Sequence, residues 1–351
     1  MTPARSPVGS HDDDPSCWTP ADFPNGKAHV VVDIPAAGLP VLEDAAREIL
    51  ASGRPLDSFS RSDLPMPGLA EPMEAVSREI DRGRGIVILR GFPVADRPLA
   101  AVEAMFWAVG RHLGDPVSQS VMGDRLGHII DVTDVDPDAR AYRANWELSL
   151  HTDMSDIVSF LCVRPAAEGG ISRFTSAVAV HDAMARRHPD LLDILYRGFP
   201  WHRLGEQAVG EAPITEHRVP HFSECQGFLS CRYVRNYIRE AAHELGGLSA
   251  KEEEALDVFD ALARSPEFCF EAMLEPGEAV IMNNYTVLHA RSAFRDGPDR
   301  NRKRLLLRLW MASRTPRPTR PEIEIYGAGR VGGIAKREGS VPSFKRRASA
   351  D

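Results

Sequence analysis

The segment Trp146-Glu-Leu-Ser-Leu150-His151-Thr152-Asp153-Met154 carries a histidine and an aspartate two positions apart, at the end of an alternating apolar run. Residues two apart on a β-strand point to the same face, so His151 and Asp153 can present an imidazole and a carboxylate to one ion. The apolar run 157–163 follows shortly afterwards, which favours a strand or a strand end for 151–153. A surface histidine near an aspartate is the more common explanation of such a spacing, so the pattern needs a third ligand to become informative.

Two further His-x-Asp sequences are weaker candidates. His11-Asp12-Asp13 lies in a stretch rich in Pro, Ser, Asp and Gly, for which we predict disorder over residues 1–25 and therefore no rigid site. In His188-Pro189-Asp190 the proline removes a hydrogen bond that a strand needs, and Asp190 is better explained as the start of a helix.

The third ligand must come from far along the chain, and His289 is the candidate. It follows a polar Asn-Asn turn between two short apolar runs, where a neutral structural histidine is the alternative. Arg304 and Arg308 come next, four apart in a strand-like apolar run, so they share one buried or half-buried face. A buried arginine usually has an anionic partner from the protein or from a ligand, and its planar guanidinium suits a carboxylate.

The rest of the chain predicts short strands interrupted by helices. Strands are expected at 85–93, 128–132, 159–163, 268–274, 278–282, 285–290 and 305–312, and helices at 40–53, 71–84, 99–113, 177–196 and 235–264. This order favours an α+β, mainly β fold: a β-sandwich or barrel decorated by helices. We expect one domain over residues 26–330, between the disordered leader 1–25 and a flexible tail 331–351.

Composition excludes several classes of protein. The net charge of −8 provides no basic field for nucleic acid, and no apolar window approaches the 18 residues that a membrane span requires. Five cysteines without a C-x-x-C pair, and no basic-then-apolar leader, predict a cytoplasmic protein without disulfides. The G-x-G-x-x-G at 327–332 is a coincidence, because too little chain follows it for a dinucleotide-binding unit.

Two histidines and one carboxylate on one face of a metal are typical of non-haem Fe(II) oxygenases. The chain resembles the TauD/TfdA-like branch of the Fe(II)- and 2-oxoglutarate-dependent dioxygenases, the clavaminate-synthase-like group, over roughly residues 80–315. The resemblance rests on ordered blocks: Gly85-Ile-Val-Ile-Leu-Arg-Gly-Phe-Pro93, His151-Thr-Asp-Met154, Leu161-Cys-Val-Arg-Pro-Ala-Ala-Glu-Gly-Gly170 with Ser172 and Phe174, His289-Ala-Arg291, and Arg304-x-x-x-Arg308. It implies a double-stranded β-helix (jelly-roll) core with external helices.

The resemblance also implies the roles of the candidate residues. His151, Asp153 and His289 look like the Fe(II) ligands, and 2-oxoglutarate and O₂ would be the co-substrates. The distal carboxylate of 2-oxoglutarate would meet Arg304 and the hydroxyl of Ser172, although Ser172 is equally well explained as a turn residue after two glycines.

Two residues are candidates on the substrate side. Arg308 looks like the second arginine of the family, near the substrate or the C1 carboxylate of 2-oxoglutarate, and Asn145 is a weaker candidate. The expected partner is a small molecule, an amino acid or another small carboxylate, which suits Arg308. The helix expected at 251–264 either contacts a second subunit in a homo-oligomer or covers the barrel.

The implied reaction is hydroxylation of an unactivated C–H bond, or a related desaturation, epoxidation or ring closure, with release of succinate and CO₂. Two other classes stay open. A zinc-dependent hydrolase or lyase could use the same ligands but would leave Arg304 and Arg308 unexplained, and a non-catalytic jelly-roll binding protein would not need all three ligands.

Overall fold

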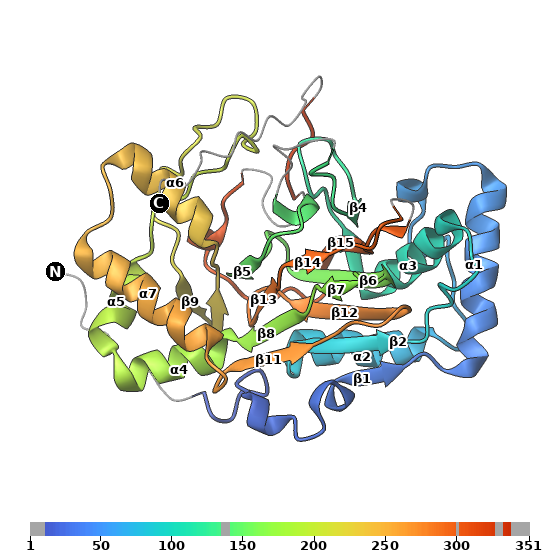
Figure 1. The fold of residues 1–351 in the computed structure, drawn as a ribbon, viewed down its shortest axis with the longest axis horizontal. Coiled ribbons are helices and arrows are strands. Elements are labelled where there is room, and N and C mark those ends of the chain that lie inside the picture. Colours follow the sequence, from blue (N-terminus) through green and yellow to red (C-terminus); the bar gives the residue numbers. More distant parts are fainter. Residues whose placement is uncertain (1–10, 135–140, 300–301, 327–332, 338–351) are drawn as a thin grey trace.

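The computed structural model describes residues 11–134, 141–299, 302–326 and 333–337 as a mixture of helices and β-sheets (Figure 1). The larger sheet has seven strands. Six follow the order β1 (Val31–Asp33), β2 (Ile86–Arg90), β12 (Glu278–Asn283), β6 (Ile157–Arg164), β15 (Leu305–Ser313) and β3 (Gly114–Pro116), and β4 (Leu126–Ile129) pairs with β15. β1 and β2 are parallel, and the other pairs in this sheet are antiparallel.

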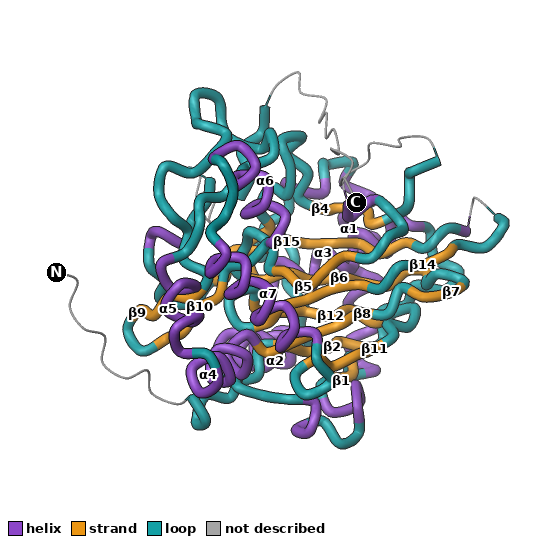
Figure 2. The backbone as a smooth tube through the Cα atoms, turned by 60° about the vertical axis from the view of Figure 1, so that its left-hand side comes forward, coloured by secondary structure: helices purple, strands orange, loops and turns teal. Residues whose placement is uncertain are grey.

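The smaller sheet contains the strand that ends at the His-x-Asp segment. Its order is β11 (Cys269–Ala272), β8 (Ser172–Ser176), β13 (Val287–Arg291) and β5 (Leu148–His151), all antiparallel. Two short antiparallel pairs, β9 (Phe222–Cys225) with β10 (Phe228–Cys231) and β7 (Glu168–Gly169) with β14 (Phe294–Arg295), complete the described strands. In Figure 2 the strands gather at the centre and helices lie around them.

Alternation along β15 shows how the larger sheet separates two cores. Leu305, Leu307 and Leu309 pack into a cluster with α1 (Leu39–Ser52), α2 (Ala70–Arg82) and α3 (Leu99–Leu113). Leu306 and Trp310 pack into the other cluster, which also contains residues of the smaller sheet. Because side chains alternate along a strand, the face that bears Leu306 and Trp310 also bears Arg308.

A second group of helices lies on the opposite side of the molecule from α1 and α3 (Figure 1). The predicted helix 177–196 is two helices, α4 (Ala177–Arg187) and α5 (Pro189–Arg197), because Pro189 cannot continue the hydrogen-bond ladder of the first. The predicted helix 235–264 is also two, α6 (Arg235–Leu245) and α7 (Ala250–Arg264). Gly246 ends α6 with φ 93°, a left-handed conformation that glycine adopts without strain. α7 packs on α4, α5 and the smaller sheet.

Most predicted strands are confirmed, with shifted ends. The strand expected at 128–132 spans Leu126–Ile129, and the one expected at 285–290 begins at Val287 because Tyr285 and Thr286 lie in the preceding turn. Short 3₁₀ turns occur at Pro20–Asp22, Gly26–His29, Ala36–Gly38, Leu56–Ser58, Ala141–Arg143 and Pro321–Ile323. Among the residues that the structure describes, no helix combines the length and apolar character that a membrane crossing needs.

The prediction of a disordered leader over 1–25 is wrong for residues 11–25. Trp18 and Phe23 are buried, and the indole of Trp18 donates a 2.9 Å hydrogen bond to the carbonyl of Arg84. Two aromatic side chains bury enough apolar surface to hold the segment on the domain in spite of its polar composition. Within the predicted flexible tail, Ile334 is also buried, and Gly333 forms a bridge with Ser118. The glycine motif at 327–332 lies outside the described residues.

Candidate metal centre

The structure brings His151, Asp153 and His289 together from two strands of the smaller sheet and the loop after one of them. His151 is the last residue of β5, Asp153 follows it, and His289 is opposite His151 on β13. Nε2 of His151 lies 3.9 Å from Oδ1 of Asp153, and Nε2 of His289 lies 3.6 Å from Oδ2. One ligand atom from each residue lies within 4.8 Å of the other two, so a single ion can reach all three.

The ring nitrogens of His151 and His289 are arranged to suit metal binding. Nδ1 of His151 lies 2.8 Å from the carbonyl of Ser149, and a carbonyl only accepts, so Nδ1 carries the proton and Nε2 offers its lone pair. Burial, together with the neighbouring His289, lowers the pKa of His151 to about 4. Both ring nitrogens of His289 are buried without a hydrogen-bond partner among the described residues. A buried polar group without a partner is costly, and a metal ion would satisfy it.

The carboxylate is held in its charged form. Burial alone would raise the pKa of Asp153, but Arg308 and the two histidines keep it well below its ordinary value. Two imidazoles and one carboxylate form the donor set that non-haem iron(II) uses, so the residues present fit that metal.

A cavity opens in front of the triad and contains the predicted co-substrate residues. Ser172, from the start of β8, and Arg304, just before β15, both line it and are both buried. Nη1 of Arg304 is buried without a partner among the described residues, and burial lowers the pKa of Arg304 to about 10. A buried cation in this state favours an anionic ligand.

Arg308 also lines the cavity and is already held by the protein. Its Nε donates a 2.6 Å hydrogen bond to Oε1 of Gln119, and its Nη1 lies 3.8 Å from Oδ2 of Asp153. Asn145, by contrast, has an exposed side chain, and its part of the chain contributes Tyr142 and Leu148 to the cavity instead. The prediction of Asn145 on the substrate side therefore has no support from its position.

Arg291 is a cavity residue to which the sequence analysis gave no role. It is buried, and its Nη2 donates to the carbonyls of Ala144 (2.8 Å) and Trp146 (2.5 Å) in the loop before β5. Burial and the nearby Arg304 lower the pKa of Arg291 to about 9. The spacing in the sequence could have indicated this position, because Arg291 is two residues after His289 on a strand and the two therefore share a face.

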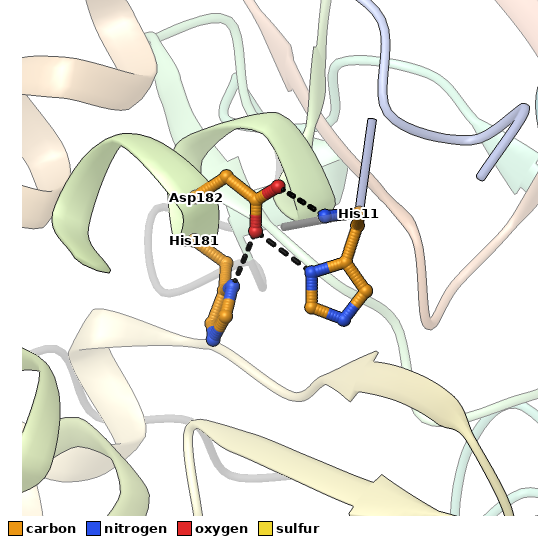
Figure 3. A group of neighbouring side chains, drawn as sticks. All are labelled: His11, His181 and Asp182. Carbon is orange, nitrogen blue, oxygen red and sulfur yellow. Dashed lines mark hydrogen bonds and ion pairs between the residues drawn. The ribbon is translucent and has the colours of Figure 1, made fainter. Parts of the chain in front are cut away.

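A second His–Asp cluster consists of His11, His181 and Asp182 (Figure 3), none of which lines this cavity. His11, predicted to lie in disordered chain, is tied to Asp182 by its backbone N–H (2.7 Å) and by Nδ1 (2.7 Å). Nδ1 of His181 lies 2.9 Å from the same carboxylate, and its Nε2 lies 2.8 Å from the hydroxyl of Tyr196. These are hydrogen-bond distances, unlike the 3.6 and 3.9 Å separations at the first site. The cluster therefore attaches the N-terminal segment to α4 by hydrogen bonds.

Comparisons with known proteins agree with the geometry of the first site. Residues 52–310 match the family described as "Taurine catabolism dioxygenase TauD, TfdA family". FR-33289 synthase of Streptomyces rubellomurinus is 30% identical over 275 residues, which cover 76% of this chain and 80% of that protein. A taurine hydroxylase-like protein of Stachybotrys chartarum is 27% identical over 313 residues, covering 84% and 78% of the two chains.

A solved structure of asparagine oxygenase, in complex with Fe(II), 3-hydroxyasparagine and succinate, has the same fold. It superposes with a TM-score of 0.62 at 18% identity, covering 87% of this chain and all of the other. The family match spans most of the chain and includes His151, Asp153 and His289. The chain belongs to the TauD/TfdA family of dioxygenases.

Proposed function

We propose that this protein is an Fe(II)- and 2-oxoglutarate-dependent dioxygenase that hydroxylates an unactivated C–H bond of a small amino-acid-like or carboxylate substrate, with release of succinate and CO₂. The observation that carries the proposal is the meeting of His151, Asp153 and His289 in a cavity that also contains buried Arg304, whose Nη1 has no hydrogen-bond partner among the described residues. A metal-dependent hydrolase would need the first feature but not the second.

Each residue has a defined task in this proposal. His151, Asp153 and His289 hold the metal, and iron(II) in such a site supplies open positions for a co-substrate and O₂ and the oxidising chemistry that side chains lack. Arg304 binds the distal carboxylate of 2-oxoglutarate, and the Ser172 hydroxyl donates a hydrogen bond to it. Arg308 balances the charge of Asp153 and presents its remaining N–H groups to the cavity.

The cavity wall favours oxidation over side reactions with water. Apolar side chains of both sheets, including Phe160, Phe174, Val280 and Leu306, line it around the polar groups. An apolar wall strengthens the charge interactions inside and keeps solvent from a reactive oxidant. The substrate class is supported by the positive charge that Arg291 and Arg308 add to the cavity, and by the asparagine oxygenase that shares the fold.

We also propose an architecture for the sheets and a cellular location for the protein. The larger and smaller sheets, which contribute to one shared core, would be the two halves of a double-stranded β-helix within a catalytic domain over residues 26–330. The five cysteines are free, which supports a reducing, cytoplasmic location.

The test is an anaerobic titration of the Fe(II)-loaded protein with 2-oxoglutarate, followed by the visible charge-transfer absorption of the chelate, with H151A as the control. We expect a band in the wild type and none in H151A. Folded protein that holds iron but gives no band would contradict the proposal and favour a hydrolase or a binding protein. A substrate screen by succinate release would follow a positive result.

A further inference from the structure

The indole of Trp310 is hydrogen-bonded to the carboxylate of Asp153. Nε1 of Trp310 donates to Oδ2 of Asp153 at 2.8 Å, and both side chains are buried. Trp310 lies on β15, on the same face as Arg308, and pairs with Val158 of β6 in the sheet register. A strand of the larger sheet therefore supplies a donor to a residue in the loop that follows β5 of the smaller sheet.

The main chain of Asp153 is fixed by other contacts. Its N–H donates a 3.2 Å hydrogen bond to Oδ1 of Asn284, and its carbonyl accepts from the buried guanidinium of Arg232. With the backbone held, the remaining freedom of the residue is rotation of its side chain. The Trp310 N–H limits that rotation, because a charged acceptor favours a donor at this distance.

Arg308 does not replace Trp310 in this task. Its Nη1 is 3.8 Å from Oδ2, beyond hydrogen-bond distance, and its Nε is bonded to Gln119. Gln119 returns a 2.9 Å hydrogen bond to the carbonyl of Arg308, and the guanidinium lies 4.8 Å from the Trp310 ring centre. Arg308 thus stabilises the negative charge of Asp153, whereas Trp310 fixes the orientation of its carboxylate.

We propose that Trp310 is a positioning residue of the metal centre: its N–H occupies one oxygen of Asp153 and keeps the carboxylate turned so that it binds the metal through a single oxygen. This inference rests on the proposed function. A carboxylate that binds through both oxygens takes one more coordination position, and the reaction needs open positions for 2-oxoglutarate and O₂. Trp310 would therefore keep coordination positions of the metal open and also strengthen metal binding by Asp153.

The test compares W310F with the wild type and with W107F. Phenylalanine keeps an aromatic ring at position 310 but has no N–H. Trp107 is a matched control, because it is equally buried and its Nε1 donates at 3.3 Å to the carbonyl of Phe59, in the cluster of α1, α2 and α3. Apoprotein is titrated anaerobically with Co(II), and the visible absorption bands report both affinity and coordination geometry.

We expect W310F to bind Co(II) about 10–100-fold more weakly than the wild type, as is usual when the hydrogen-bond partner of a metal ligand is lost, and with an altered band pattern. W107F should keep both the affinity and the spectrum. If W310F fails to fold, β-(3-benzothienyl)alanine at position 310 replaces the indole N–H by sulfur in a ring of nearly the same shape.

Wild-type affinity and spectrum in the folded variant would overturn the inference, as would an equal loss in W107F. A wild-type protein that binds neither Fe(II) nor Co(II) would instead contradict the proposed function. The two failures are therefore distinguishable in the same experiment.

Discussion

His151 and His289 are directly opposite each other on the antiparallel strands β5 and β13, and their ring centres lie 4.3 Å apart. Directly opposed residues on neighbouring strands have their side chains on one face of the sheet at close range. The pairing of these two strands is therefore what turns two distant histidines into one metal site. The closeness of the two rings does not supply a hydrogen bond to His289, whose ring nitrogens have no partner among the described residues.

Replacing His289 with leucine should separate metal binding from folding. Leucine fills much of the volume and removes two unpartnered buried nitrogens, so we expect the apoprotein of H289L to melt at or above the wild-type temperature. Fe(II) at 100 times its Kd should stabilise the wild type by about 2.7 kcal/mol and leave H289L unchanged. Thermal denaturation with and without Fe(II) measures both effects, and H128Q, an exposed histidine variant, is the control.

Replacing Arg304 with methionine should weaken the binding of 2-oxoglutarate but stabilise the apoprotein. The variant loses the proposed anion partner, which costs roughly 2–5 kcal/mol when one member of a buried charge pair is removed, so the KM for 2-oxoglutarate should rise at least tenfold. The apoprotein should become more stable, because the variant removes a buried cation whose Nη1 has no hydrogen-bond partner among the described residues. Calorimetric titration with 2-oxoglutarate and apoprotein melting check the pair, and unchanged 2-oxoglutarate affinity would contradict the role of Arg304.

Ser172 offers a smaller and more specific test. S172A should weaken 2-oxoglutarate binding by about 0.5–1.5 kcal/mol, the usual contribution of one hydrogen bond, whereas S172T keeps the hydroxyl and should stay within twofold of the wild type. Both variants are measured by steady-state KM for 2-oxoglutarate. Equal values for S172A and the wild type would leave Ser172 with no role beyond its place at the start of β8.

His221 should make the fold sensitive to acid. Burial, with a smaller contribution from Arg235, lowers the pKa of His221 to about 3, and its ring is packed between Tyr233 and Phe259. The unfolded chain binds the proton at an ordinary pKa of 6.5, so this contribution to stability is complete above pH 6.5 and falls as the pH drops towards 3. The free energy of unfolding should fall by about 2 kcal/mol between pH 8 and pH 5. In H221F, urea denaturation should lack that part of the pH dependence.

The stabilisation by the His11–Asp182 contact should depend on pH in the opposite direction. The hydrogen bond to Asp182 raises the pKa of His11 above its ordinary 6.5, so the stabilisation by the charged pair is complete below pH 6.5. It is lost as the pH rises through the raised pKa, which should loosen residues 11–17. Hydrogen exchange of this segment at several pH values measures the effect, and H11A should exchange fast at every pH. Exchange in the wild type that does not change with pH, after correction for intrinsic rates, would contradict the prediction.

Features that depend on local periodicity could be predicted from the order of residues alone. The two-residue spacing of His151 and Asp153 and the four-residue spacing of Arg304 and Arg308 predicted that each pair meets at one site. The structure places all four at one cavity, although Asp153 lies just after β5 and Arg304 just before β15. The ends of helices were predictable only where a residue restricts the backbone: Pro189 divides the predicted helix 177–196, and Asp190 beside it was predicted as the start of a helix.

Which distant groups meet could be seen only in the folded chain. Nothing near Trp310 in the chain indicates that its N–H reaches Asp153, and the pairing of β5 with β13 depends on the burial of whole sheet faces. His11 was predicted to be disordered from composition, yet Trp18 and Phe23 anchor its segment through contacts with residues far along the chain. Periodicity is local because side chains alternate within one strand, whereas pairing and docking depend on the total apolar surface that the folded chain removes from water.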